Sequence, residues 1–293
     1  MGYEWLALIS AALWALTSLI SVIPSRHLGA FAYSRYRMAV VSAVLAIASL
    51  ITGGWQTLQL HDLLWLIISG IIGIFIGDTA LFACMNRIGP RRAELLFTCN
   101  AIFTPILGIL CFQETMNSWQ IAGASLLLIG VALAIMFGKN QKHQWEAIRG
   151  PLALAILLGL TSALGQSFGA ILAKPALHSA TDPISASLIR MTSALVAHLI
   201  LWWRMPSLTR SHQPMNWSIF GYVFTNGFLA MAVGMTLILY ALRHGNVGLV
   251  ALFSATTPIM ILPMLWIYTK QIPTRSAWIA SALVVLGTGL LLH

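Results

Sequence analysis

The sequence predicts an all-α integral membrane protein with ten transmembrane helices, arranged as two inverted five-helix repeats. Three observations support this fold class: the composition, ten long apolar runs, and a similarity between the two halves of the chain. Apolar residues occupy 59% of the 293 positions and charged residues only 8%, whereas a soluble domain usually carries about 25% charged residues. A lipid bilayer is the solvent in which so few charges suffice, since the helices hydrogen-bond their own backbone there.

The ten apolar runs define the expected elements. A helix needs about 20 mostly apolar residues to cross the hydrocarbon core, and runs of about that length cover 5–23, 33–52, 62–85, 91–112, 118–137, 151–173, 184–203, 217–241, 247–268 and 276–292. The longest gap, "GKNQKHQWEAIRG" at 138–150, is polar and precedes Pro151, a residue favoured at the first position of a helix. We therefore expect a first repeat at 1–138, an inter-repeat loop at 139–150 and a second repeat at 151–293.

The two halves resemble each other in order along the chain. "GDTALFACMNRIG" at 77–89 matches "GMTLILYALRHGN" at 234–246, and the same shift brings Gly130 onto Gly287. With a slightly smaller shift, "YRM" at 36–38 meets "IRM" at 189–191. Because each half has an odd number of spans, the second half enters the membrane from the opposite face, which predicts an inverted repeat of the kind that secondary transporters use.

Basic residues predict the orientation of the helices. The gaps after spans one, three, five, seven and nine hold Arg26, Arg35, Arg87, Arg91, Arg92, Lys139, Lys142, Arg149, Arg204, Arg210, Lys270 and Arg275. The other gaps hold mainly Lys174 and Arg243. Since basic loops stay in the cytoplasm, both termini are expected outside. The net charge of +9 does not indicate nucleic-acid binding, because these residues are spread singly and form no basic face.

Residues 91–133, "RRAELLFTCNAIFTPILGILCFQETMNSWQIAGASLLLIGVAL", resemble the EamA repeat of the drug/metabolite transporter superfamily. Glu114 occupies the position of the Glu that ends the fourth helix of that repeat. Trp14, Arg37 and Arg190 also stand where the family tends to have Trp and Arg. The resemblance covers the whole chain, once in each half. It implies a multi-pass transporter of the bacterial inner membrane that exports a small metabolite such as an amino acid, an amine or a drug-like compound.

The sequence departs from the family at two positions. Gln271 replaces the second-half counterpart of Glu114, and Ala101 replaces a usual Pro, with Pro105 one turn later. The family motifs are specific for the fold and leave the substrate open. Some relatives are described with cytoplasmic termini, which is opposite to the orientation that the charge count predicts. For this chain we follow the charge count and expect both termini outside.

Asp78 and Arg37 form the expected buried charge pair. Asp78 lies about seven residues, or roughly 10 Å at about 1.5 Å per residue, before the basic end of its span. Arg37 reaches a similar depth from the same end of span two. An unpaired charge at membrane depth costs at least about 2.5–3.5 kcal/mol, which favours an ion pair. The alternative is that Asp78 binds a coupling proton or a cationic substrate and Arg37 tunes its proton affinity.

The second half lacks the matching acid. Arg190 occupies the position of Arg37, whereas Met235 replaces Asp78. One interpretation is that Arg190 extends outward along its long side chain to reach the membrane surface. The other is that it meets the carboxyl end of a helix, or a carboxylate or phosphate of a substrate.

Two glutamates lie near the ends of span four. Glu94 stands beside Arg91 and Arg92, which favours a surface ion pair over a proton-coupling role. Glu114 lies at the other boundary, where capping of a helix end or a local pair is expected, and Lys174 at the same boundary is a candidate partner.

Polar or amphipathic side chains from five spans reach the depth of the membrane centre: Trp14, Thr17, Asn100, Gln166, Asn226, Thr256 and Thr257. Asn100 and Thr257 are repeat equivalents, so a pseudo-two-fold axis would place them opposite each other at the centre, where such transporters bind substrate. Tyr240 and Phe82 are candidates for aromatic walls, and packing against neighbouring helices is the commoner alternative for such residues. The alternative for each polar side chain is an interhelical hydrogen bond worth under about 1 kcal/mol.

The remaining patterns predict packing. Ser69, Gly73 and Gly77 recur every four residues and favour close helix contact. Cys84, Cys99 and Cys111 lie inside apolar runs and are odd in number, so neither a disulfide framework nor a cysteine metal site is expected.

These features favour a secondary transporter that works by alternating access, driven by a proton or by an exchanged metabolite, with Asp78 as the leading proton candidate. No Walker phosphate loop is present, and no cofactor or metal is expected. The partners are the lipid bilayer, a small-molecule substrate and protons, and the protein is a monomer or a homodimer. A lipid flippase on the same fold is the alternative; a membrane enzyme is disfavoured because His-Glu-x-x-His and Gly-x-Ser-x-Gly are absent.

Overall fold

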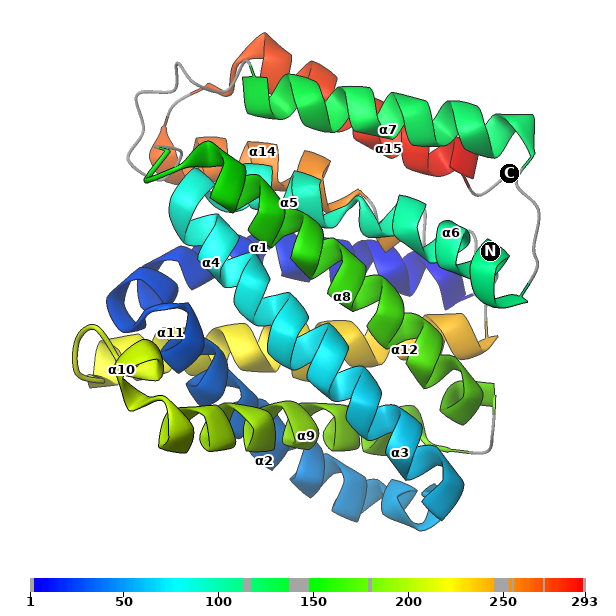
Figure 1. The fold of residues 1–293 in the computed structure, drawn as a ribbon, viewed down its shortest axis with the longest axis vertical. Helices are drawn as coiled ribbons and strands as arrows, with labels where there is room; N and C mark the ends of the chain where they lie inside the picture. The colour runs from blue at the N-terminus through cyan, green and yellow to red at the C-terminus, as the bar shows by residue number, and fades with distance from the viewer. Residues whose placement is uncertain are drawn as a thin grey trace.

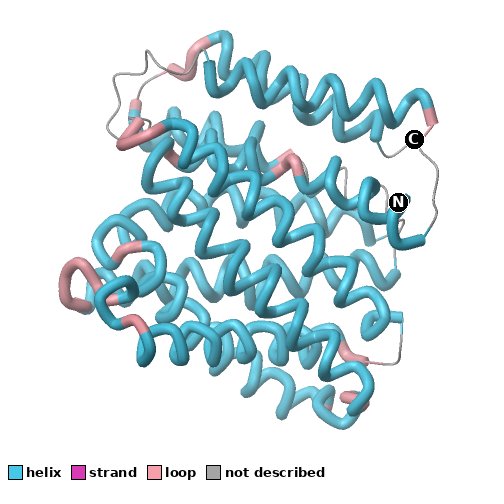
Figure 2. The backbone as a smooth tube through the Cα atoms, in the orientation of Figure 1, coloured by secondary structure: helices cyan, strands magenta, loops and turns pink. Residues whose placement is uncertain are grey.

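The computed structural model describes residues 3–112, 117–136, 148–178, 181–244, 253–254, 256–270 and 272–291. Within these residues the chain is almost entirely helical and has no β-strand (Figure 2). Six helices are long and apolar enough to cross a membrane, at Leu6–Leu28, Ala30–Thr52, Leu60–Ile88, Leu152–Ala173, Pro183–Arg204 and Trp217–Ile238. Shorter apolar helices cover Ile121–Leu133, Thr257–Tyr268 and Arg275–Leu290. The protein is an all-helical, multi-pass membrane protein, and the full number of ten spans stays a prediction.

The helices follow one another as Figure 1 shows. The first half contains α1 (Leu6–Leu28), α2 (Ala30–Thr52), α3 (Leu60–Ser69), a first π-helical segment (Gly70–Asp78), α4 (Thr79–Ile88), α5 (Pro90–Phe97), α6 (Asn100–Phe112) and α7 (Ser118–Met136). The second half contains α8 (Leu152–His178), α9 (Pro183–Arg204), α10 (Pro206–Thr209), α11 (Trp217–Asn226), a second π-helical segment (Gly227–Met235), α12 (Thr236–His244), α14 (Thr257–Thr269) and α15 (Arg275–Leu291).

Glycine and proline set the sharp turns between neighbouring helices. Gly29 and Gly89 have φ of 82° and 85°, values that only glycine adopts without strain. They separate α1 from α2 and α4 from α5, so that each pair turns within a single residue. Pro90 then begins α5, where its missing N–H has no partner to lose.

The predicted fourth span, 91–112, is interrupted between α5 and α6. The Thr98 hydroxyl donates to the Glu94 carbonyl at 2.8 Å, and the Cys99 amide donates to the Leu96 carbonyl at 3.1 Å. A side chain that binds the preceding turn and a tightened backbone both disturb a regular helix. The chain therefore restarts its helix at Asn100, beside the cavity described below.

The two halves repeat one unusual backbone feature. Gly70–Asp78 and Gly227–Met235 are both nine-residue π-helical segments, each preceded by a ten-residue helix. Gly227 follows Gly70 by 157 positions, which is the shift that aligns Gly77 with Gly234. Since π-helix is rare, its recurrence at the same place in both halves supports the internal repeat that the sequence predicts.

Contacts between the halves are reciprocal. α7 and α15 pack side by side at one edge of the molecule (Figure 1). A Cβ placed on Gly130 would lie 2.8 Å from the Ala280 carbonyl oxygen, and one on Gly287 would lie 2.7 Å from the Gly123 carbonyl oxygen. Ala280 follows Gly123 by the same 157 positions. Two equivalent patches that contact each other in this way are typical of a two-fold relation.

Side-chain and backbone contacts define two ends of the bundle. At one end, which we call the basic end, the His212 amide donates to the Leu28 carbonyl at 3.2 Å, and Arg35 Nη1 of α2 donates to the carbonyl of Thr209, the last residue of α10, at 3.2 Å. At the opposite end, the Asp182 amide donates to Thr57 Oγ1 at 2.7 Å and links the starts of α9 and α3. Both marked chain termini lie far from α10 (Figure 1).

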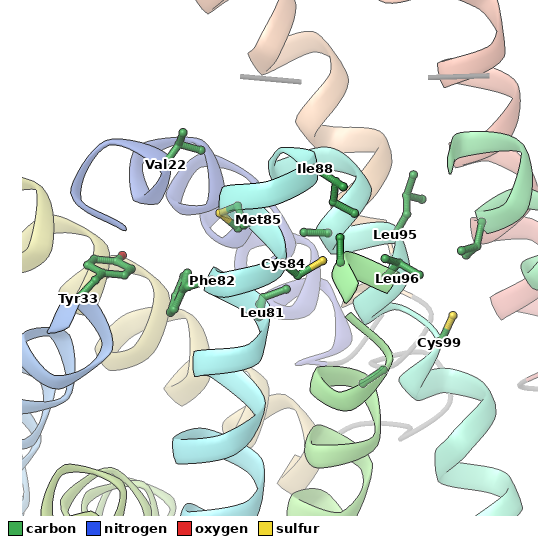
Figure 3. Close-up of a cluster of buried hydrophobic side chains, with 14 of the residues drawn as sticks. Val22, Tyr33, Leu81, Phe82, Cys84, Met85, Ile88, Leu95, Leu96 and Cys99 are labelled. Atoms are coloured by element: carbon green, nitrogen blue, oxygen red, sulfur yellow. The ribbon is translucent and has the colours of Figure 1, made fainter. Parts of the chain in front are cut away.

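An apolar cluster fills the space between α1, α2, α4 and α5 near the basic end. Figure 3 shows part of it, with Val22, Tyr33, Leu81, Phe82, Cys84, Met85, Ile88, Leu95, Leu96 and Cys99. Tyr33 meets the Phe82 ring edge to face, with centroids 4.6 Å apart. The packing fixes Phe82 at the wall of the cavity. Cys84 and Cys99 are buried thiols within this cluster, while the side chain of Cys111 is not described.

Candidate functional site

A cavity of about 260 Å³ lies where the two halves meet. Its lining comes from α1, α2, α4, α5, α6, α8, α11, α12 and both π-helical segments: Trp14, Thr17, Ser18, Ser21, Arg37, Ile74, Asp78, Leu81, Phe82, Glu94, Phe97, Asn100, Thr104, Gln166, Ala170, Asn226, Ala230, Met231, Met235 and Ile238, with Ser254. Small-molecule sites usually measure about 300–1,000 Å³. The cavity therefore suits a compact metabolite.

Arg37 and Asp78 form a buried ion pair at the cavity wall, through Arg37 Nη2 and Asp78 Oδ2. Arg37 comes from α2 and Asp78 ends the first π-helical segment. Their side chains are only 4% and 9% exposed, so each charge has lost most of its water. The pairing that the sequence favours is present, because two opposite charges buried at one depth stabilise each other.

Further contacts hold the Arg37 guanidinium in place and join the two halves. Its Nη1 donates to Asn226 Oδ1 at 3.4 Å, and its Cζ lies 4.6 Å from the centroid of the Phe82 ring. The Asn226 amide in turn donates to the Thr17 carbonyl at 2.7 Å. Asn226 and Thr17 thus serve as interhelical hydrogen-bond partners and line the cavity at the same time.

Glu94 is placed differently from the surface ion pair that its neighbours Arg91 and Arg92 suggest. It is only 8% exposed, lines the cavity, and accepts a hydrogen bond from the Ser18 hydroxyl. Within the described part of the chain, no basic side chain lies within ion-pair distance of it. The surface interpretation is wrong because α5 turns this side of the helix inward, toward α1.

The predicted central residues divide into two groups. Trp14, Asn100 and Gln166 line the cavity, together with Thr17 and Asn226. The Trp14 indole donates to the Ala230 carbonyl at 2.9 Å, which fixes the ring between the halves.

Tyr240, Thr256 and Thr257 are not among the residues that line the cavity. Tyr240 is 43% exposed and packs against Tyr3 with ring centroids 5.6 Å apart. The hydroxyls of Thr256 and Thr257 donate to backbone carbonyls three residues earlier in the chain. Thr257 begins α14 as Asn100 begins α6, yet only Asn100 reaches the cavity.

Arg190 also lies outside the cavity lining. It is 6% exposed, so it does not extend to the membrane surface. Glu114 and Gln271 lie outside the described residues.

Sequence reasoning missed several cavity residues, among them Ser18, Ser21, Phe97 and Thr104. Ser18 and Ser21 follow Trp14 by four and seven positions. That spacing keeps the three residues on one face of a helix, so it could have identified Ser18 and Ser21 as cavity residues once Trp14 was placed there.

Small residues bring the first π-helical segment against α8, as predicted. A Cβ on Gly73 would lie 3.2 Å from Gly169 Cα, and the Ser69 hydroxyl donates to the Gly169 carbonyl at 2.6 Å. The contact is almost backbone against backbone, which places Asp78 within the wall shared by both halves.

Comparison with known proteins gives the family. The model of the EamA-like transporter family matches residues 1–136 and 153–293. The chain is 22% identical to an uncharacterized transporter, sll1164, of Synechocystis over 80% of this chain and 68% of that protein. It is 28% identical to the uncharacterized transporter YyaM of Bacillus subtilis, with only 39% of this chain and 38% of the relative covered. An uncharacterized transporter of Haemophilus influenzae is 26% identical over 56% of this chain and 52% of the relative.

A solved crystal structure of another protein shares the fold. It matches with a TM-score of 0.70 and 17% identity, covering 98% of this chain and 95% of the other. At this identity the likeness concerns the fold alone. With two family-model matches that together span most of the sequence, the chain belongs to the EamA-like transporter family.

Proposed function

We propose that this protein is a secondary transporter that carries a small amine-bearing metabolite, such as an amine or an amino acid, across the bacterial inner membrane by alternating access. The two inverted five-helix repeats, 1–138 and 151–293, rock about the central cavity. Family membership and the multi-pass helical fold support transport in general. The finer assignment is supported by the chemistry of the cavity.

The observation that carries the proposal is the pair of acids in the cavity wall. Asp78 already has a cationic partner in Arg37, whereas the described hydrogen-bond partner of the Glu94 carboxylate is the uncharged Ser18 hydroxyl. A buried carboxylate without a cation is costly unless it takes up a proton or a cationic ligand. Glu94 is therefore our candidate for the group that a proton and a protonated amine occupy in turn. This ranking reverses the preference for Asp78 that the sequence alone favours.

The remaining lining fits such a substrate. Trp14 and Phe97 offer aromatic surface, and Asn100 and Gln166 offer amide groups. Aromatic faces attract cations, while amides orient polar groups of a ligand. The volume of about 260 Å³ limits the substrate to a small molecule.

Purified protein in liposomes tests the proposal. A thermal-shift screen of small amines and amino acids would name a ligand, and a pH-sensitive dye trapped in the vesicles would report proton movement during uptake. We expect Glu94→Gln to lose uptake driven by a pH gradient by at least about tenfold, since it removes the group that changes partners. Glu94→Asp, which keeps a carboxylate, is the matched control and should retain part of the coupling.

Three results would contradict the proposal. Coupled uptake by Glu94→Gln at the wild-type rate would remove Glu94 from the role. Lipid scrambling without solute uptake would instead indicate a flippase, and covalent change of the solute would indicate an enzyme.

A further inference from the structure

Arg190 occupies a groove made by glycines of the first π-helical segment. A Cβ on Gly70 would lie 2.8 Å from Arg190 Cα, and one on Gly73 would lie 3.5 Å from Arg190 Nη2. The side chain therefore runs from the level of Gly70 to that of Gly73. Residues five apart are bonded one turn apart in a π-helix, so the guanidinium lies one turn before Asp78, within range of its charge.

Arg37 has the mirrored placement in the other half. A Cβ on Gly227, the counterpart of Gly70, would lie 3.5 Å from Arg37 Cγ. Arg37 stands seven residues after the start of α2 at the basic end, and Arg190 stands seven residues after the start of α9 at the opposite end. The two arginines thus approach the middle of the bundle from opposite ends.

Among the described residues, Asp78 is the one carboxylate that forms an ion pair with either of these two arginines. Met235 stands in the second half where Asp78 stands in the first. No carboxylate of the described residues lies within ion-pair distance of Arg190, and its buried Nε has no hydrogen-bond partner there. Arg190 does not line the cavity, so a substrate held in the cavity does not neutralise it.

We propose that Arg190 is a positioning residue that serves as the second partner of Asp78, exchanging with Arg37 as the transporter changes sides. In the described conformation Asp78 pairs with Arg37; when the halves rock, the carboxylate moves to Arg190. This inference rests on the proposed alternating access. Exchange keeps the Asp78 carboxylate paired with an arginine in both end states. One arginine is without this partner in each state, so neither end state is destabilised by complete loss of the ion pair.

The side of the membrane from which a reagent reaches the cavity tests this exchange of ion-pair partners. In a variant without native cysteines, Met231→Cys places a thiol in the cavity wall, and a membrane-impermeant maleimide is added from either side of oriented vesicles. When this Met231→Cys variant keeps Arg190, its thiol should be labelled from both sides of the membrane; this variant is the reference background. In Arg190→Gln we expect labelling from one side to fall by at least about tenfold relative to the other, because only the Arg37-paired state keeps an ion pair. Arg190→Lys, which keeps the charge, should restore the wild-type ratio.

If Arg190→Gln does not fold, a second variant that keeps Arg190 tests the same exchange. Met235→Asp gives Arg190 its own carboxylate and should bias the labelling ratio in the same direction as Arg190→Gln. A merely structural role would change the amount of folded protein and leave the ratio between the sides unchanged, and that result would overturn the exchange. Labelling of the reference background from one side only, with or without a bound amine, would overturn alternating access itself, and the exchange with it.

Discussion

The first π-helical segment ends on Asp78, and the second ends on Met235 at the same position of the repeat. Their backbones match over nine residues, as do the reciprocal contacts of the two arginines with Gly70 and Gly227. The side chains at the last position of the two segments do not match, since one is a carboxylate and the other a thioether. The comparison teaches that the halves share one backbone plan around a common cavity, while the carboxylate that pairs with an arginine stands in the first half and a methionine takes its place in the second.

The same asymmetry appears at Glu94. Its counterpart at the 157-position shift is Ala251 in the sequence. Both acids that line the cavity, Asp78 and Glu94, therefore belong to the first half, whereas the second half contributes the amides Gln166 and Asn226. The acidic groups of the lining thus come from one repeat only, while amides come from both, since Asn100 belongs to the first half.

The largest effect on stability should come from breaking the Arg37–Asp78 pair. In the described conformation, Arg37→Met leaves the Asp78 carboxylate without its cation, a change that costs about 3–5 kcal/mol. Thermal unfolding of purified protein in detergent would measure it. The double variant Arg37→Met with Asp78→Asn removes both charges and should recover much of the loss; equal damage in the single and double variants would show that the pair itself matters little.

A smaller effect should follow from making the halves alike. Met235→Asp introduces an acid whose isolated burial costs about 2.5–3.5 kcal/mol, but Arg190 stands where Arg37 pairs with Asp78, and pairing should offset most of that cost. In an Arg190→Gln background the same substitution should be far more damaging. Melting temperatures of the four combinations give the coupling, and additive losses would argue against a contact between positions 190 and 235.

The smallest effects should distinguish the glycine contacts of the two π-helical segments. Gly169→Ala places a Cβ 2.8 Å from Gly73 backbone, whereas Gly234→Ala meets the Trp14 side chain at 2.9 Å. Overpacking costs about 1–3 kcal/mol, and we expect Gly169→Ala at the higher end because backbone yields less than a side chain. Gly221→Ala, which faces open space, is the control and should be neutral or stabilising. A Gly169→Ala variant as stable as this control would contradict the close contact.

Some site features could be predicted from depth along the chain. Asp78 and Arg37 were paired by counting residues from the ends of their spans, and that reasoning holds because each helical residue advances the chain by a fixed rise. The repeat was visible because Gly77 and Gly234 keep the same spacing to their neighbours. The inward position of Glu94, in contrast, depends on how α5 is rotated against α1. In the sequence, the neighbouring Arg91 and Arg92 favoured a surface ion pair for Glu94, which the structure contradicts.

The sequence by itself determined that this is a helical membrane protein and where its strongest apolar helices lie, and it named a set of polar side chains near the middle of those runs. Only the tertiary structure decided which of them face the cavity: Asn100 but not Thr257, Glu94 but not Arg190. The reason is physical. In lipid the outer face of a helix is as apolar as its packed face, so the amphipathic pattern that reveals rotation in a soluble helix is weak, and packing between helices sets the direction of each side chain.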